Sequence, residues 1–462
     1  MKHNLMKKSK TLVAASIALK MAMQAAMKRQ ISAMTLLTGM ALSMPVVTAS
    51  AQGTLEDYNR AYALKRHFQV DSVYHWARST AWHDSTHVLH YLVSTPQGKK
   101  YVSYDADKDE QRSYDSQEAM ERALGIKPRP ARKPVFGRPH QRHWMEVDEE
   151  HKAYPVASPD GKWEAYIEGY NVVLHEAGKP YTQAKRILTQ DGTIGCYYSN
   201  RIQWSPDGKY LFVCKRIPVE KRYVYYVESS PSDQLQPILH KQEYAKPGDQ
   251  LPQHLPVIIN IATGKKVEAD PHQLENQYEL EWMQWIPDGK EVTMEYNKRG
   301  HHLYQMLAMN AETGKLRTIV EERSDKFVNY ARIWRQFINN GKQLLWASER
   351  DNWNHLYLYD VQKGKVIRQI TKGDWFVRGV QRVDEKNGCI YFSASGMNKG
   401  EDPYLVHYYK IGIDGKNLVS LTPEEGNHNV QYSRDFRYLV DTYSKVNKAP
   451  VTVVREAETG KL

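Results

Sequence analysis

The five residues Ser158-Pro-Asp-Gly-Lys162 recur as Ser205-Pro-Asp-Gly-Lys209, and weaker copies of the same turn occupy residues 286–290, 338–342, 385–388 and 433–437. Asp-Gly and Asn-Gly dipeptides supply the positive backbone φ angles that tight hairpins need. Each copy stands between β-prone residues, as expected where two strands meet. The pattern therefore predicts a hairpin at every copy.

A second turn, in which glycine precedes lysine, alternates with the first. Its glycines are spaced by 50, 50, 51 and 45 residues, at Gly264, Gly314, Gly364, Gly415 and Gly460. Two hairpin turns in a period of about fifty residues mean four strands in each repeat, which is typical of a propeller blade. We therefore expect an all-β fold, a β-propeller of seven or eight four-stranded blades. Two stacked β-sandwiches are the alternative, but sandwiches do not keep two turn types in register over four periods.

Two parts of the repeat are irregular. The first-turn glycines Gly208 and Gly289 are 81 residues apart, so one repeat carries extra residues, which we interpret as a long loop inserted near residues 220–253. The chain ends at Leu462, directly after the turn at Gly460. Because a propeller has to avoid bare sheet edges, we expect the last blade to be a three-strand remnant or to borrow an N-terminal strand.

The N-terminal residues 1–51 have the order of an export signal. A basic pair, Lys28-Arg29, precedes an apolar run, and small residues lead to a predicted cleavage between Ala51 and Gln52. The apolar run is too short and too interrupted for a stable membrane span. We therefore expect an exported, periplasmic protein. Residues 52–143 should form a diverged first blade with a helical and basic, proline-bearing connection, and residues 144–462 the main propeller.

The net charge of +11 does not indicate a nucleic-acid partner. Residues 1–51 contain seven basic residues and no acidic ones, and without them 57 basic residues face 53 acidic ones. A phosphate-binding surface thereby loses its main support.

No cofactor or metal site is predicted. The three cysteines have no zinc-type spacing, and an odd, sparse set does not make a disulfide framework. His301 and His302 would point to opposite faces of a strand. No glycine-rich phosphate loop opens a helix.

Four stretches resemble the propeller of dipeptidyl peptidase IV-like serine peptidases, in the prolyl oligopeptidase clan. They are residues 203–211 (Gln-Trp-Ser-Pro-Asp-Gly-Lys-Tyr-Leu), 243–249 (Glu-Tyr-Ala-Lys-Pro-Gly-Asp), 348–360 (Ser-Glu-Arg-Asp-Asn-Trp-Asn-His-Leu-Tyr-Leu-Tyr-Asp) and 422–428 (Thr-Pro-Glu-Glu-Gly-Asn-His). The resemblance covers residues 146–462, and residues 58–107 more loosely. It implies an eight-bladed propeller over an α/β-hydrolase, with propeller residues holding the free amino group of a peptide.

This sequence departs from that family in two ways. No Gly-x-Ser-x-Gly elbow occurs, so the chain has no predicted catalytic residue and no covalent route to peptide hydrolysis. The family's paired glutamates, which neutralise the substrate ammonium, have no counterpart in residues 188–200, where Asp191 is the one acidic residue. Two carboxylates would offset the desolvation of an ammonium group better than one.

Three substrate-binding candidates follow. Arg350 offers a planar fork that suits a carboxylate, and Glu349 precedes it. An ion pair tying adjacent blades is the alternative reading of this segment. Asp191 is the weakest candidate.

Two functions fit these features. The first is the substrate-gating propeller portion of an exported serine peptidase that acts on peptides, inactive alone, with a hydrolase domain encoded downstream. The second is a stand-alone periplasmic propeller that binds peptides or glycans. Whether the chain belongs to an enzyme stays open at this point, as does dimerisation through the 220–253 insertion.

Overall fold

The computed structural model describes residues 53–66, 74–83, 86–127 and 155–462. The predicted export signal and most of the basic connection, up to residue 143, lie outside these ranges. Within them, no helix has the length and apolar character needed to cross a membrane. The chain divides into two compact units, Met1–Tyr74 and His75–Leu462, which are described separately.

The first unit contains helix α2 (Leu55–Arg66), which the sequence did not lead us to expect. Thr54 and Asp57 form reciprocal hydrogen bonds at its start: the Thr54 amide donates to the Asp57 carboxylate (3.0 Å), and the Asp57 amide donates to Thr54 Oγ1 (3.2 Å). This capping box satisfies amide groups that a helix N-terminus leaves unpaired. The helix is mostly polar and exposed, so it shows no apolar period in the sequence.

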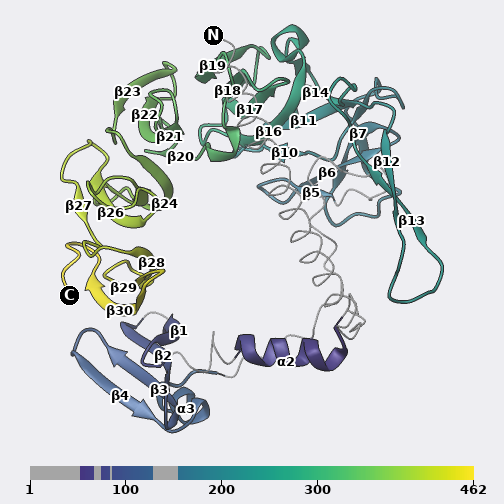
Figure 1. Cartoon of the computed structure of the whole chain (residues 1–462). Helices are drawn as coiled ribbons and strands as arrows, with labels where there is room; N and C mark the ends of the chain where they lie inside the picture. Colours follow the sequence, from purple (N-terminus) through teal and green to yellow (C-terminus); the bar gives the residue numbers. More distant parts are fainter. Residues whose placement is uncertain (1–52, 67–73, 84–85, 128–154) are drawn as a thin grey trace, which may run out of the picture. The chain divides into compact units, whose positions relative to one another are not determined.

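The second unit consists of antiparallel sheets that follow one another along the chain (Figure 1). The first sheet is β1 (Ala77–Trp82), β2 (Val88–Thr95), β3 (Gly98–Asp105) and β4 (Glu110–Tyr114), followed by helix α3 (Gln117–Leu124). The second is β5 (Val156–Ala157), β6 (Trp163–Glu168), β7 (Asn171–Glu176) and β8 (Lys185–Ile187). The third is β9 (Tyr197–Tyr198), β10 (Gln203–Trp204), β11 (Tyr210–Ile217), β14 (Gln253–Asn260) and β15 (Lys266–Glu268).

Four further sheets follow along the chain. They are β16 (Gln277–Trp285), β17 (Glu291–Lys298), β18 (Leu303–Asn310) and β19 (Leu316–Arg323); β20 (Arg335–Ile338), β21 (Gln343–Ser348), β22 (His355–Asp360) and β23 (Lys365–Gln369); β24 (Phe376–Asp384), β25 (Cys389–Ser395), β26 (Val406–Gly412) and β27 (Val419–Ser420); and β28 (Asn427–Tyr432), β29 (Tyr438–Lys445) and β30 (Lys448–Glu456). Short 3₁₀ helices, Pro271–Leu274 and Tyr330–Arg332, precede β16 and β20.

Each of these sheets is a meander in which every strand pairs with the next, except that β9 of the third sheet pairs with β11 and that β11 pairs with β14 across the inserted residues. Figure 1 shows the first strands, such as β16, β20 and β24, toward the inside of the arrangement and the last strands, such as β19, β23 and β27, toward the outside. The predicted β-propeller is thus confirmed, and the described residues contain seven blades. The last blade has three strands, as expected.

The repeated turns explain why the blades form. Ser158 Oγ donates to Asp160 (2.6 Å) and accepts from the Trp163 amide (3.0 Å), while Gly161 adopts a φ of 68°. The second copy has the same bonds around Ser205 and Asp207. Serine and aspartate therefore fold the turn locally, and glycine supplies its left-handed residue.

Buried apolar side chains join each blade to the next. Five clusters connect the blades from β5–β8 to β28–β30, including Leu174 with Val213, Phe212 with Met294, Tyr304 with Trp346, Leu358 with Phe392, and Tyr391 with Leu439. Because each cluster draws on two neighbouring sheets, the core runs between the blades.

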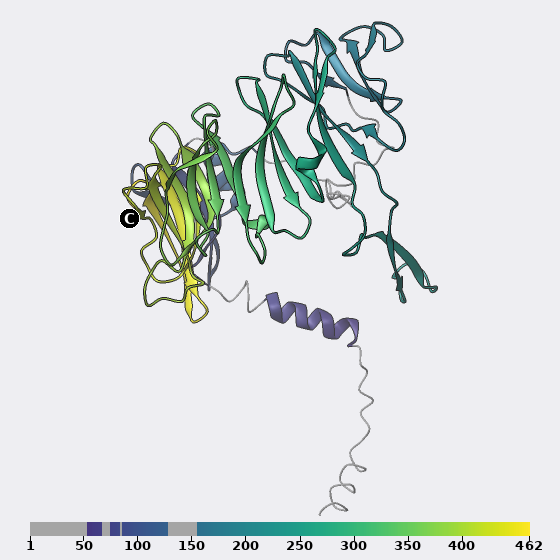
Figure 2. The ribbon, with the colours of Figure 1, turned by 90° about the horizontal axis from the view of Figure 1, so that it is seen from above.

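The insertion at residues 220–253 is not the loop that we expected. It contains a two-stranded hairpin of β12 (Tyr223–Glu228) and β13 (Ile238–Glu243), which extends beyond its blade (Figures 1 and 2). Residues 223–227 are all tyrosine or valine and favour a strand, but the Ser-Pro segment at residues 229–233 led us to expect a loop.

Candidate functional site

The carboxyl group whose pKa is raised most among the described residues, that of Glu281, lies on an inner strand. Strand β16 carries Glu279 and Glu281, and Glu281 is directly opposite Glu295 of β17. The register of the two strands shifts between Glu281 and Gln284, where Trp282 adopts a φ of 51°. A bulge and a left-handed aromatic residue re-aim side chains, and both features are frequent beside functional sites.

Glu295 is the buried member of this carboxylate cluster, which we define as Glu279, Glu281 and Glu295. Its side chain is 1% exposed, pairs with Arg335 of β20 and accepts a hydrogen bond from the Tyr304 hydroxyl. Burial raises the pKa of Glu295 to about 7, although Arg335 and Tyr304 favour its charged form. Arg335 also lies over the Trp282 ring, with its Cζ atom 3.9 Å from the ring centre, so two blades meet at this point.

Glu281 keeps its proton at neutral pH. Burial, together with the neighbouring charge of Glu279, raises the pKa of Glu281 to about 8, against the opposing effect of Arg201. Its Oε1 atom is buried and has no hydrogen-bond partner among the described residues. A carboxyl group that retains its proton near neutral pH in a partly open position is a candidate for ligand binding.

Cationic groups of the preceding blade border the cluster. Arg201 donates to the Leu280 carbonyl (2.9 Å), which holds it beside β16. Burial, with the nearby charges of Arg201 and Arg216, lowers the pKa of His254 to about 3. His254 is therefore neutral at any physiological pH, and the positive charge here comes from arginine.

This arrangement suits a peptide's charged end. An ammonium group that approached Glu281 would favour its ionised form, so that binding would displace a proton. The arginines beside it supply fixed donors for carbonyl or carboxylate oxygens. The cluster could thus bind a cationic amino group and an adjacent carbonyl together.

The structure places Arg350 in an ion pair between blades. Its guanidinium bonds to Glu322 of β19 and donates to Ser348 Oγ (2.8 Å), between the rings of Tyr357 and Tyr359. Glu349 accepts a bond from Asn329 (3.3 Å). These contacts favour the inter-blade ion pair, the alternative that the sequence left open, and the substrate-binding role stays a prediction.

Asp191 lies apart from Arg350, in contact with β11 and β15. Lys215 (2.6 Å) and Lys266 both bond to it, and Tyr198 donates a further hydrogen bond (3.0 Å). Burial disfavours its charge, but the bonds from the two lysines outweigh this effect and lower the pKa of Asp191. Two internal cations therefore already neutralise this carboxylate.

Sequence reasoning missed the carboxylate cluster. The signal was present in Glu279 and Glu281, two acidic residues with spacing two in a predicted strand, because residues with this spacing share one face. The contribution of Arg335, more than fifty residues away in the next blade, left no such signal.

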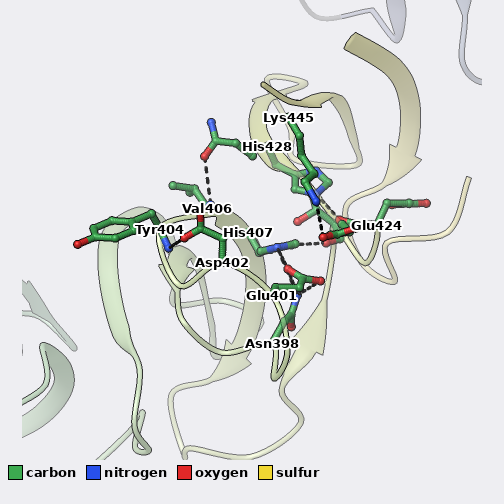
Figure 3. Close-up of polar contacts among 12 residues, drawn as sticks. Asn398, Glu401, Asp402, Tyr404, Val406, His407, Glu424, His428 and Lys445 are labelled. Carbon is green, nitrogen blue, oxygen red and sulfur yellow. Dashed lines mark hydrogen bonds and ion pairs between the residues drawn. The ribbon is translucent and has the colours of Figure 1, made fainter. Parts of the chain in front are cut away.

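A second polar cluster, around His407 and His428, is structural (Figure 3). His407 contacts Glu401 and the Thr422 carbonyl (both 2.8 Å), and His428 contacts Asp441 (2.8 Å) and the Glu424 carbonyl (2.7 Å). The two rings are 4.7 Å apart and almost fully buried. Every ring nitrogen has a partner within the protein, so this cluster ties β26 to β28 and offers no open position to a ligand.

Comparison with known proteins connects this fold to one family. Residues 136–450 match the family model described as the dipeptidyl peptidase IV (DPP IV) N-terminal region. A probable dipeptidyl peptidase 4 from Arthroderma benhamiae is 24% identical over 322 residues, which cover 64% of this chain and 40% of that protein. Dipeptidyl peptidase 4 of Arthroderma otae is 32% identical over 111 residues, 23% of this chain and 14% of that protein.

Solved structures include related chains at low similarity. The crystal structure of Porphyromonas gingivalis dipeptidyl peptidase 4 gives a TM-score of 0.49 at 18% identity, covering 83% of this chain and 49% of that chain. The matched part of this chain thus spans half or less of the length of these relatives.

Proposed function

The chain belongs to the family of the dipeptidyl peptidase IV N-terminal region, and from this membership we propose that it is the substrate-gating propeller portion of an exported serine peptidase acting on peptides. The relatives named dipeptidyl peptidase 4 support a peptide substrate. The N-terminal order of basic, apolar and small residues supports export to the periplasm.

The observation that carries this proposal is the inner-strand carboxylate cluster. Glu281 presents a carboxyl with a pKa of about 8 beside a second carboxylate and an arginine. A peptide's amino terminus is the complementary cation. We assign Glu279 and Glu281 the binding of that terminus, a role that the segment at residues 188–200 cannot fill with Asp191 alone.

Catalysis by these 462 residues alone is not part of the proposal. The sequence has no Gly-x-Ser-x-Gly motif, and without an activated nucleophile a propeller binds and orients a peptide but does not cleave it. The nucleophile would belong to a hydrolase domain encoded downstream. The hairpin β12–β13 is the surface that we assign to dimerisation.

Calorimetric titration of the purified chain with a short peptide tests the binding role. We expect a peptide with a free amino terminus to bind at pH 7 and its N-acetylated form to bind about tenfold to a hundredfold more weakly, because a charged hydrogen bond contributes about 1.5–3 kcal/mol. Glu281→Gln should remove the difference. Glu321→Gln, on the outer strand β19, is the control and should keep it.

Equal affinity for both peptides in the unaltered chain would refute the assignment. The second candidate is a stand-alone binding propeller for peptides or glycans. Titration with oligosaccharides separates the two ligand classes, since a glycan carries no ammonium group for Glu281 to bind.

A further inference from the structure

The seam between the first and the last blade is built differently from the others. None of the five apolar clusters that join successive blades includes a described residue of β1–β4. Instead, a cavity of about 370 Å³ lies between Leu89 and Tyr91 of the first blade and Thr452 and Val454 of β30. Apart from the Trp82 ring, which stacks on the Tyr438 ring with 6.5 Å between their centres, this seam therefore lacks the apolar packing that joins the blades from β5–β8 to β28–β30.

Strand pairing does not close this seam either. In the described part of the chain, β1 pairs with β2 alone, and β28–β30 form a separate sheet. Side chains make the connection: Trp82 Nε1 donates to the Gln431 carbonyl (3.0 Å), and Asp107 accepts from the Tyr438 hydroxyl (3.1 Å) and Arg437 (3.0 Å). The closure thus depends on a few polar contacts and on the stacking of Trp82 against Tyr438.

His87 lies at the centre of these contacts. Its Nδ1 is 2.6 Å from Asp107 of its own blade, and its Nε2 is 2.9 Å from Asp435 of the last blade. The Tyr438 ring packs edge-on against it, 5.1 Å away, and Arg437 is the cation nearby. Ionised carboxylates only accept hydrogen bonds, so both nitrogens can bond at once only when the ring is a protonated imidazolium.

The charge balance supports this state. Burial disfavours the imidazolium, but the hydrogen bonds to Asp107 and Asp435 outweigh burial and raise the pKa of His87 above its usual 6.5. The pKa of Asp435 falls to about 2, because bonds from His87 and Ser433 outweigh its own burial. A histidine with a raised pKa stabilises the closed seam at low pH, and this stabilisation disappears as the pH rises through the raised value.

We propose that His87 is a pH-sensitive latch, which holds the first and last blades together when it is protonated and releases them when it is neutral. Once the proton is lost, one ring nitrogen presents a lone pair to a carboxylate. The bond becomes a repulsion, and in the described part of the chain only the contacts of Trp82 and Asp107 with the last blade then oppose opening of the seam.

Electron spin resonance distance measurements across the seam test the latch. Spin labels would be placed on cysteines replacing Lys100 of β3 and Asn447 beside β30, both exposed, in a Cys196→Ser background in which the other two cysteines are buried. We expect one narrow distance at pH 5.5 and an added longer population at pH 9. His87→Gln should show the longer population at both pH values.

The matched control is His272→Gln. His272 also contacts a carboxylate, Glu275 (3.0 Å), but both residues belong to one exposed segment. This variant should keep the pH response. A distance distribution that is identical at pH 5.5 and 9 in the unaltered background, or a response that survives His87→Gln, would overturn the latch.

A measurement on the unaltered chain guards against misfolding of the His87→Gln variant. The His87 ring can be titrated directly by nuclear magnetic resonance in the intact chain. We expect a pKa above 6.5 and a fall in that pKa in Asp435→Asn. A His87 pKa at or below 6.5 would contradict the proposal.

Discussion

Glu281 makes the folded chain sensitive to pH in a direction unlike that of an ordinary carboxylate. The unfolded chain loses this proton near pH 4.5, whereas the folded protein holds it until about pH 8. Between these values the folded state binds more protons than the unfolded state, so the contribution of Glu281 to stability falls as the pH rises. Most carboxylates, which have lowered pKa values, act in the opposite direction.

Replacing Glu281 with Gln should therefore reduce the loss of stability that the protein shows as the pH rises. We expect the free energy of unfolding of Glu281→Gln to fall less between pH 5 and pH 8.5 than that of the unaltered chain. Urea denaturation at several pH values measures it. The control is Glu321→Gln, exposed on β19, which should leave the pH dependence of the unfolding free energy unchanged. If the unaltered chain and Glu281→Gln show parallel pH dependences, Glu281 has an ordinary pKa and the prediction is wrong.

For single residues, the sequence indicates the strand face on which a side chain lies, but not the groups that surround it in the fold. Glu279 and Glu281 could be placed on one strand face from their spacing. The raised pKa of Glu281, however, depends on burial in the folded chain and on the charge of Glu279, and it is moderated by Arg201 and Arg335, which belong to two other blades. Likewise, the sequence around Asp191 does not indicate that Lys215 and Lys266 form ion pairs with it.

Among the elements, the ion pair of Arg350 joins β19 to the segment before β22. Glu322 is buried and also accepts hydrogen bonds from Trp346 Nε1 and Ser348 Oγ (both 2.8 Å). Arg350→Ala would leave this carboxylate buried without its cation. We expect a loss of about 3 kcal/mol in the free energy of unfolding, measured by urea denaturation.

A double-mutant cycle separates this structural role from a substrate clamp. If the pair is structural, the double variant Glu322→Gln with Arg350→Ala should be less destabilised than the two single losses added together. Peptide affinity in the folded variants should stay unchanged. Lost affinity with unchanged stability would instead support Arg350 as a carboxylate clamp.

The hairpin β12–β13 should be separable from the propeller. Its strands pair with each other, and Tyr225, Tyr226 and Leu239 are exposed, so it adds little to the described core. Replacing residues 224–242 with a short Gly-Ser linker should change the melting temperature by no more than about 2 °C, as measured by calorimetry. Light scattering of the same variant tests the assigned dimer surface, since a dimer that survives the deletion would exclude it.

Turn chemistry made the blades predictable. Ser, Asp and Gly act within five residues, so each hairpin could be recognised without its neighbours, even at Ser433, where Phe436 takes the left-handed position with a φ of 61°. The hairpin in the 220–253 insertion was missed because its strands lack such a turn. Helix α2 was missed because its polar surface shows no apolar period.

At the scale of the whole molecule, buried apolar clusters connect the blades from β5–β8 to β28–β30. No such cluster of described residues spans the seam at His87, between the last blade and the first. Family membership and the inner-strand carboxylates together support a peptide-binding propeller.

The purified chain should show no turnover of Xaa-Pro chromogenic peptides, because it lacks a nucleophile motif. Serine-reagent-sensitive turnover would contradict this expectation.

Proton release on peptide binding tests the central claim most directly. Calorimetric titration at pH 7 in two buffers of different ionisation enthalpy measures it. Because Glu281 is protonated at pH 7 and should ionise when an ammonium binds, we predict release of about one proton with a free-amine peptide. The release should vanish at pH 9 and in Glu281→Gln. Binding without proton release at pH 7, or release that is unchanged in Glu281→Gln, would contradict the account.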